Sequence, residues 1–408
     1  MRCRVLFIIP TLDRCGAEKQ LTLLATRLPK DQFDVKVVLL TRIGPYLETL
    51  LNEGIPVELV GKKGKLSLRA YRKLKSIIKS FQPDIVHTWL FAANAYGRMA
   101  AFACKVPVVI CGERCVDLWK GSMHWWIDKA LEPRTDAYVV NSAGIVDFYK
   151  RRGIPAEKFV VIPNAVELPA DRSALTKREL LEELGLSQDG VVESVGKQAF
   201  FENVSISDTA QRSKEPWIIG LVARLWPQKR IQDALWAADQ LKFSLLNFFL
   251  IIIGDGPEKD ALLRYREDLQ LNDRVIFLGE RDDVSRIMPS FDLLWNCSEY
   301  EGQSNSILEA LSHGVPVIAS DIPGNRELID AGENGLLISE FDGDDIRRKT
   351  ALSRETIRLL KPENQDMLKA WGEAGKKRVE NDFSIEKMIE RHASLYKRLL
   401  LEKKIRSK

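Results

Sequence analysis

Two glutamates, Glu301 and Glu309, stand eight residues apart in a segment whose residue types suit the binding of phosphates or sugar hydroxyls. Glu301 follows a short apolar run typical of a strand, and a helix is expected to begin near Ser304. The backbone N–H groups of Gln303, Ser304 and Asn305 would then point out of the helix N-terminus, which favours negative charge. Carboxylates accept several hydrogen bonds from sugar hydroxyls. The competing interpretation is an acidic loop followed by a solvent-facing glutamate.

The elements that must position these residues alternate between strand and helix patterns. The expected strands are nearly continuous apolar runs, as in a parallel sheet that is buried on both faces. In the first part of the chain they are 5–9, 35–40, 57–60, 85–87, 106–110, 137–140 and 159–162, and in the second part 217–222, 248–253, 275–278, 293–295, 315–319 and 336–338. This alternation predicts α/β architecture with doubly wound sheets.

The alternation stops near Asn164 and restarts at Trp217, which divides the chain. We expect two Rossmann-like domains, a linker or insertion between them, and a C-terminal helix that packs back on the first domain. The corresponding residues are 1–169, 216–383, 170–215 and 384–408. Ligands bind such sheets at the carboxyl ends of the strands, so a cleft between the domains is the expected site.

Composition excludes several classes of protein. The 408 residues are 45% hydrophobic and 29% charged, as in ordinary globular proteins, and the net charge of +4 gives no reason to expect nucleic acid. Residues 1–170 hold 26 basic and 16 acidic side chains, so the first half is basic and the second acidic. The six cysteines form no zinc pattern and favour a reducing cytoplasm. The sequence predicts no signal peptide and no transmembrane helix.

The segment after Glu309 carries a resemblance to a known family. Gly314-Val315-Pro316-Val317-Ile318 follows, and then a turn with Gly324 and Glu327. The whole segment resembles the signature of the retaining glycosyltransferases called group one or family four. Further segments are similar to motifs of that family in the same order: Gly16-Ala17-Glu18, Asp84-Ile85-Val86-His87, Asn141-Ser142, Asn164-Ala165-Val166-Glu167, Gly220 to Leu225 with Lys229, Gly254-Asp255-Gly256-Pro257 and Gly279-Glu280-Arg281. The chain departs from the pattern at Cys15, Trp89 and Ala165.

The resemblance implies a GT-B enzyme that moves a hexose from a nucleoside diphosphate sugar, expected to be UDP-linked. The acceptor would be a glycan or a lipid-linked glycan of the cell surface, and the anomeric configuration would be retained. Arg224 and Lys229 would hold the diphosphate, because a guanidinium fork and an ammonium both suit phosphate oxygens. Glu301 would contact the transferred sugar, and Glu309 the ribose. The competing interpretation of the two cations is a pair of solvated loop residues.

Further roles follow from the same resemblance. The N–H of Gly16 would face the donor sugar or phosphate from the first domain. The segment from Leu278 to Arg281 would lie near the nucleotide base. His87 is a candidate active-site residue, with a structural histidine as the alternative. Weaker candidates for the acceptor are Asn94, Glu113 and Arg114, whereas His124, His313 and His392 are expected to be structural.

Neither a metal nor another cofactor is expected. The string Asp342-Gly343-Asp344 is interpreted as a polar turn outside the site. The segment 62–79 holds eight basic residues and no acid, with Leu74, Ile77 and Ile78 as an apolar side. Such a helix suits an anionic membrane surface, although a solvated helix face explains it equally well. The expected location is cytoplasmic, possibly peripheral on the inner face of the plasma membrane.

Three other functions remain open at this point. A nucleotide-sugar epimerase with the same fold would need no acceptor and would release an altered sugar. A phosphorylase would carry pyridoxal phosphate. A non-catalytic sugar-binding protein would keep the fold without turnover, although the paired cations and the two spaced glutamates argue against it.

Overall fold

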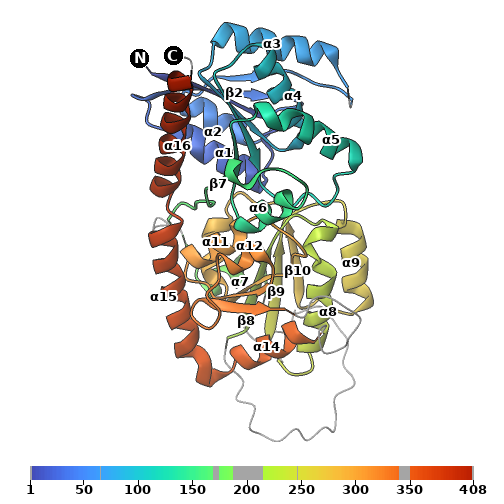
Figure 1. The fold of residues 1–408 in the computed structure, drawn as a ribbon. Helices are drawn as coiled ribbons and strands as arrows, with labels where there is room; N and C mark the ends of the chain where they lie inside the picture. The colour runs from blue at the N-terminus through green and yellow to red at the C-terminus, as the bar shows by residue number, and fades with distance from the viewer. Residues whose placement is uncertain are drawn as a thin grey trace, which may run out of the picture. The chain divides into compact units, whose positions relative to one another are not determined.

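The computed structural model describes residues 2–64, 66–168, 174–186, 215–245, 247–339 and 350–406. The chain forms two compact units. Unit 1 comprises Met1–Glu167, Tyr300–Asn305 and Asn381–Lys408, and unit 2 comprises Leu168–Glu299 and Ser306–Glu380. Each unit is built on its own parallel sheet with helices on both faces (Figure 1). The predicted α/β class, with two Rossmann-like sheets, is therefore confirmed.

Unit 1 contains a seven-stranded sheet in the order β3-β2-β1-β4-β5-β6-β7, with every pair parallel. Its strands are β1 (Cys3–Ile9), β2 (Phe33–Leu39), β3 (Val57–Leu59), β4 (Ile85–Trp89), β5 (Val108–Glu113), β6 (Ala137–Val140) and β7 (Phe159–Val161). All seven expected strands are present. The fifth ends later than expected, so that Glu113 is its last residue.

The helices of unit 1 cover both faces of this sheet. They are α1 (Gly16–Arg27), α2 (Tyr46–Asn52), α3 (Leu68–Phe81), α4 (Phe91–Ala103), α5 (Ser122–Leu131), α6 (Ala143–Lys150) and α16 (Ile385–Arg406). Successive side chains of β1 point to opposite faces. Phe7 packs in the core that includes residues of α1 and α16, whereas Leu6 and Ile8 pack with residues of α3 and α4.

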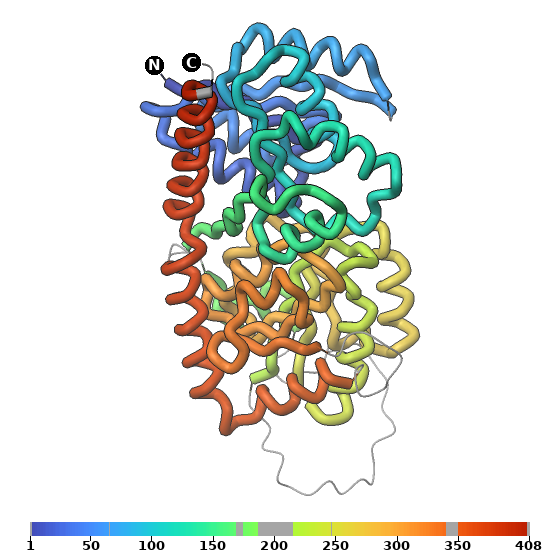
Figure 2. The backbone as a smooth tube through the Cα atoms, in the orientation of Figure 1, coloured from blue at the N-terminus to red at the C-terminus, as the bar shows by residue number. Residues whose placement is uncertain are grey.

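Helix α16 contributes to the core of unit 1. Its buried residues are Met388, Ile389, Leu395, Tyr396 and Leu399, which follow helical spacing. The side chain of Ser384, just before the helix, accepts a hydrogen bond from the Lys387 N–H at 3.4 Å. In Figure 2 the C-terminal segment runs along the same unit as the N-terminal strands. About 380 residues of sequence therefore separate two elements of one core.

Unit 2 contains a six-stranded parallel sheet in the order β10-β9-β8-β11-β12-β13. The strands are β8 (Trp217–Val222), β9 (Phe248–Ile253), β10 (Val275–Gly279), β11 (Leu293–Asn296), β12 (Val317–Ser320) and β13 (Gly335–Ile338). Its helices are α7 (Lys177–Glu183), α8 (Ile231–Leu241), α9 (Lys259–Asp268), α10 (Val284–Ile287), α11 (Asn305–Ser312), α12 (Pro323–Arg326), α14 (Ala351–Leu359) and α15 (Gln365–Asp382). The first residue of α11 and the last two residues of α15 belong to unit 1. All six expected strands are present.

The described part of the expected linker, which includes α7, belongs to unit 2. Thr176 caps α7 by accepting a hydrogen bond from the Glu179 N–H, and Lys177 pairs with Asp292 at 2.7 Å. Residues 187–214 and the string Asp342-Gly343-Asp344 lie outside the described residues. Within the described part of the chain, no helix combines the length and the apolar character that crossing a membrane requires.

Candidate active site

The expected donor-binding cations lie in the loop that follows β8. Arg224 comes two residues after the strand, and Lys229 ends a short 3₁₀ turn, Pro227–Lys229. The guanidinium carbon of Arg224 lies 5.2 Å from the centre of the Trp226 ring, a cation–π contact that orients the fork. The Lys229 N–H donates to the Trp226 carbonyl at 2.8 Å. Both cations are therefore carried on one tightly turned loop of unit 2.

Two glycines of the next loop hold this turn in place. A Cβ atom on Gly254 would overlap the carbonyl oxygen of Ala223, and one on Gly256 would overlap that of Leu225. Gly254 also has φ +141°, which side chains rarely permit. The Leu225 N–H donates to the Asp255 carbonyl at 3.0 Å. The motif at 254–257 thus supports the backbone that carries Arg224.

A third loop joins the same edge of the sheet, where the carboxyl ends of β8, β9 and β10 meet. The Gly254 N–H donates to the Gly279 carbonyl at 2.8 Å. The Arg281 guanidinium is bound to both oxygens of Asp283, at 2.7 and 2.6 Å, and to Glu183 of α7 at 3.1 Å. These carboxylates raise the pKa of Arg281. Its side chain is thus engaged by carboxylates, and the predicted contact with a nucleotide stays a prediction.

The predicted segment around Gln303 belongs to unit 1, where it meets a cluster of amide side chains. Asn164 is the centre of that cluster. Its backbone N–H donates to the side-chain oxygen of Gln303 at 2.9 Å, and its side-chain amide donates to Asn305 at 2.7 Å. Arg114 and Asn141 both donate to the Asn164 side-chain oxygen. These two hydrogen bonds join Asn164 to residues that lie 139 and 141 positions further along the chain.

Gly16 is held by the same segment. The Asn305 side-chain amide donates to the Gly16 carbonyl at 3.2 Å, and Gln20 donates to the Asn305 side-chain oxygen at 3.3 Å. Gln20 also exchanges two hydrogen bonds with Ala165, at 2.7 and 2.9 Å. Gly302 leaves no room for a side chain, because a Cβ there would overlap the Arg114 carbonyl. Sequence reasoning identified these motifs separately and missed the amide network that connects them.

The remaining predicted residues of this segment differ in exposure. Ser304 is buried, and Glu301 is half-buried in the loop of unit 1. Glu309 is half-buried on α11, in the part of that helix that belongs to unit 2. Helix α11 begins at Asn305, one residue after the expected start. Their contacts with a donor stay predictions.

His87 lies in the core of unit 1 on β4. Its Nδ1 is 2.8 Å from the Tyr396 hydroxyl of α16, and its ring lies 6.0 Å from that of His392. Burial, together with the neighbouring His392 and the charge of Arg114, lowers the pKa of His87 well below its ordinary value. The imidazole is fully buried, and its environment favours the neutral form. This geometry favours the structural alternative over contact with a sugar.

The weaker acceptor candidates cluster at the ends of β4 and β5. The Arg114 guanidinium lies 4.7 Å from the Trp89 ring, and burial lowers its pKa to about 9. Asn94 donates to the Gly112 carbonyl at 2.9 Å. Buried polar atoms of Trp89, Asn94, Arg114 and Asn141 have no hydrogen-bond partner among the described residues. Buried polar atoms are normally paired, so these four atoms are exceptions grouped at one edge of the unit 1 sheet.

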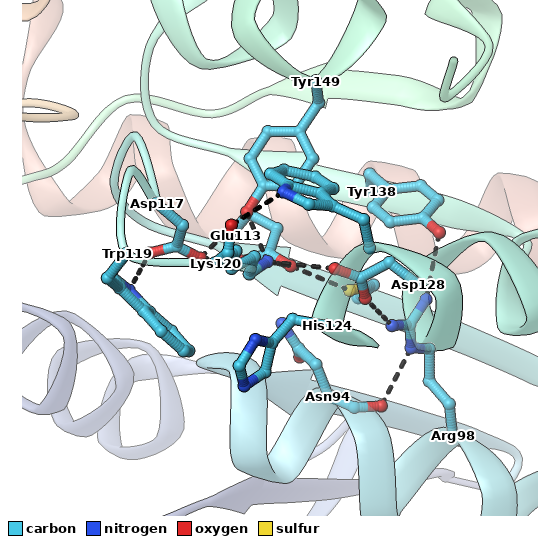
Figure 3. A network of polar contacts seen from close by, with 12 residues as sticks. Asn94, Arg98, Glu113, Asp117, Trp119, Lys120, His124, Asp128, Tyr138 and Tyr149 are labelled. Carbon is cyan, nitrogen blue, oxygen red and sulfur yellow. Dashed lines mark hydrogen bonds and ion pairs between the residues drawn. The ribbon is translucent and has the colours of Figure 1, made fainter. Parts of the chain in front are cut away.

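Glu113 joins a different set of contacts, a network of buried charges (Figure 3). Lys120 lies 3.2 Å from Glu113, 3.0 Å from Asp117 and 3.0 Å from Asp128. Asp128 also pairs with Arg98 at 2.5 Å. Burial raises the pKa of Glu113 to about 7, against the opposing effect of Lys120. Sequence analysis did not find this network; the signal it offered was a charged Lys120 among apolar neighbours.

Helix α3 is amphipathic, and its apolar side faces the core of unit 1. Leu74, Ile77 and Ile78 are buried in the core of unit 1 and are not available to a membrane. The basic side chains of Arg69, Arg72 and other residues are exposed on the opposite face. This arrangement fits the alternative of a solvated basic helix face, and contact of the segment 62–79 with an anionic membrane surface stays a prediction. An amphipathic pattern has the same appearance whether its apolar side meets lipid or core.

Two Rossmann-like units, each built on its own parallel sheet, are the architecture of the GT-B class. The family model described as "Glycosyl transferases group 1" matches residues 205–378, and the one described as "Glycosyltransferase Family 4" matches residues 15–169. Together the two matches span most of the chain, and both models describe glycosyltransferases. The protein is a glycosyltransferase.

Relatives with named activities are similar to this chain over most of its length. The chain is 26% identical over 398 residues to an Escherichia coli UDP-Gal:alpha-D-GlcNAc-diphosphoundecaprenol alpha-1,3-galactosyltransferase, covering 92% of each chain. It is 24% identical over 354 residues to a Campylobacter jejuni N,N'-diacetylbacillosaminyl-diphospho-undecaprenol alpha-1,3-N-acetylgalactosaminyltransferase, covering 81% of this chain and 84% of the relative.

A solved structure supports the fold. The structure of Anabaena Alr3699/HepE in complex with UDP and glucose has a TM-score of 0.78 at 20% identity and covers 97% of this chain and 99% of its own. At this identity the similarity establishes the GT-B architecture.

Proposed function

We propose that this enzyme transfers a hexose from a UDP-linked donor to a lipid-linked glycan acceptor during the synthesis of a cell-surface polysaccharide, with retention of the anomeric configuration. The observation that carries the proposal is the turn bearing Arg224 and Lys229, which Gly254 and Gly256 support from the next loop. The acceptor class follows the two relatives, whose names specify diphosphoundecaprenol-linked acceptors. The nucleotide follows the name of the Escherichia coli relative.

In this proposal the main catalytic contribution is stabilisation of the departing nucleoside diphosphate. Arg224 offers a fork for two phosphate oxygens, and Lys229 adds a second positive charge five residues on. Glu301 orients the transferred sugar through its hydroxyls, and Glu309 binds the ribose. No metal or other cofactor takes part in the proposed reaction. No side chain is assigned as a nucleophile.

The proposal is tested by transfer assays with UDP-glucose, UDP-galactose and UDP-N-acetylglucosamine against lipid-diphosphate acceptors. We expect Arg224→Ala, Lys229→Ala and Glu301→Ala each to lower kcat/KM by at least about 100-fold, while the unfolding temperature stays near that of the wild type. Arg264→Ala on α9 is the matched control, because it removes an exposed cation of the same unit away from these loops. NMR of the product decides between retention and inversion.

Two outcomes would overturn the proposal. Full activity in all three variants would remove the site assignment. Turnover without an acceptor, yielding free UDP and an altered sugar, would assign the enzyme to the epimerases instead.

A further inference from the structure

One segment of unit 1 has its side chains arranged the opposite way from an ordinary surface loop. Between Asp117 and Asp128 the charged residues are buried, with the Lys120 side chain 0% and the Asp128 side chain 1% exposed. The large apolar residues face outward: Leu118 is 53% exposed, Trp119 56%, Met123 74% and Trp126 70%. Single exposed apolar residues are common, but four in nine positions form a patch of the kind that marks an interaction site. We call these four residues the apolar patch.

The buried charges explain why the apolar side chains point outward. Lys120 is bound on the inside by Glu113, Asp117, Asp128 and the Tyr149 hydroxyl, the last at 2.7 Å (Figure 3). With Lys120 fixed inside, its neighbours Leu118 and Trp119 are left on the outer side. Burying these ions costs free energy unless every ion is fully paired. The paired network therefore determines the conformation of the segment, at a cost in free energy that the packing of apolar side chains alone would not incur.

The aromatic part of the patch is also held in position. The Trp119 ring lies 5.5 Å from Phe91 and 5.1 Å from His124, and its indole N–H donates to Asp117 at 3.1 Å. Phe91 opens α4, and His124 lies in α5. A pre-positioned surface loses little side-chain entropy when it binds a partner.

Cations lie on α5 and on the turn that packs beside it. Residues 118–127 contain no acidic residue. Lys129 on α5 and Arg151 after α6 are exposed, and the Arg152 guanidinium lies 4.9 Å from the Trp125 ring. Gly153 brings the turn after α6 next to α5, since a Cβ there would lie 3.6 Å from the Lys129 side chain. Lys129, Arg151 and Arg152 therefore lie on α5, which carries Met123 and Trp126, or on the turn packed against it.

We propose that the apolar patch of unit 1, with Lys129 and Arg151 beside it, docks the enzyme on an anionic lipid bilayer. Tryptophan partitions into the interfacial layer of a bilayer, and adjacent cations add attraction to anionic headgroups. The combination of apolar insertion with basic charge is what stable peripheral binding requires. The proposal rests on the proposed lipid-linked acceptor, and it gives the membrane contact to α5 and the preceding loop, because the apolar side of α3 is buried.

The test uses the full-length enzyme and vesicles of phosphatidylcholine with or without phosphatidylglycerol. We expect the wild type to float with the anionic vesicles and to be released by salt. The double variant Met123→Ser/Trp126→Ser should bind about tenfold more weakly, because it removes two inserting side chains. Phe243→Ser is the matched control, since Phe243 is 76% exposed but belongs to unit 2. The charge variant Lys129→Glu/Arg151→Glu should lose the preference for anionic vesicles.

A fluorescence measurement locates the contact. Brominated lipids should quench the wild type, and Trp119→Phe/Trp126→Phe should lose part of that quenching while still binding. The proposal is overturned if the wild type stays unbound at low salt, or if Met123→Ser/Trp126→Ser binds as well as the wild type. Dimerisation of the wild type in place of vesicle binding, abolished by the same variant, would make the patch a self-association surface and would equally overturn it.

Activity measurements separate this proposal from the proposed function. The variant Met123→Ser/Trp126→Ser should transfer sugar to a short-chain acceptor in solution as fast as the wild type, and more slowly to an acceptor embedded in vesicles. Vesicle binding without transfer to any acceptor would contradict the proposed function and leave the docking surface supported.

Discussion

At the C-terminal edge of the unit 2 sheet, the position of the Arg224 guanidinium depends on residues that contribute no side chain. Gly254 and Gly256 allow the loop after β9 to lie directly against the backbone of 223–225. The same principle operates in unit 1, where Gly302 lies against the Arg114 carbonyl. Glycine thus allows the close backbone approach that positions the candidate ligand-binding loops.

A glycine substitution tests this dependence. Gly254→Ala should lower the free energy of unfolding by about 3 kcal/mol, because the added Cβ overlaps Ala223 and the φ of +141° is strained. We also expect weaker UDP binding, measured by calorimetry, because the loop bearing Arg224 must move. Gly185→Ala is the control: it has φ +65° with no atom near its Cβ, so a loss of about 1 kcal/mol with unchanged binding is expected. Wild-type UDP affinity in Gly254→Ala would contradict this account.

At the scale of elements, α16 stabilises unit 1 by bringing His392 and Tyr396 into contact with His87 inside the core. His392 and His87 have rings 6.0 Å apart, and Tyr396 bonds to His87. Burial lowers the pKa of His392 to about 3, although its hydrogen bond to the Met388 carbonyl acts in the opposite direction. The helix is therefore packed on groups that must remain uncharged.

This arrangement predicts a pH dependence. Since the pKa of His392 is lower in the folded state, its contribution to stability is complete above about pH 6.5 and is lost as the pH falls towards 3. Across that window each such histidine contributes a slope of up to about 1.4 kcal/mol per pH unit. Glu113, with a pKa raised to about 7, contributes the opposite slope between about 4.5 and 7. The measured slope of the unfolding free energy against pH therefore contains both the histidine and the glutamate contributions.

A comparison of variants isolates the histidine. His392→Leu removes the titrating group, so its unfolding free energy, measured by urea titration from pH 7 to pH 5, should fall less steeply than that of the wild type. Parallel curves for the two proteins would show that His392 does not titrate as its burial implies.

At the scale of the whole molecule, each sheet packs into hydrophobic cores of its own, and one core from each unit includes a helix that is distant in sequence. One contains residues of β1, α1 and α16, and the other residues of β8, β9 and α15. Tyr396 is fully buried in the first, and Trp371 is 6% exposed in the second. Each sheet is thus stabilised by its own helices, including helices that are distant in sequence.

Matched core substitutions should act on one unit each. Tyr396→Ala and Trp371→Ala should each lower stability by about 3–5 kcal/mol, because both leave cavities in a packed interior. Hydrogen exchange followed by mass spectrometry should show faster exchange in β1 and β4 for the first variant, and in β8 and β9 for the second. Equal acceleration in both sheets for either variant would mean that the cores unfold as one cooperative unit.

The sequence by itself determined the local elements and the motifs. Continuous apolar runs and helical spacing depend on neighbours a few residues apart, and they predicted all thirteen strands of the two sheets. The candidate binding loops were predicted from the strand positions, because ligands bind at the carboxyl ends of parallel strands. The family resemblance supplied the candidate roles of Arg224, Lys229 and Glu301.

Only the tertiary structure decided which polar side chains meet. The contact of Asn164 with Gln303 spans 139 residues, and no local pattern encodes such a pairing. Burial likewise decided that His87 faces Tyr396, and that the apolar side of α3 lies in the core. The outward apolar patch exists because Lys120 finds its carboxylates inside. Periodicity shows which side chains share a face, whereas the packing of distant elements decides what that face contacts.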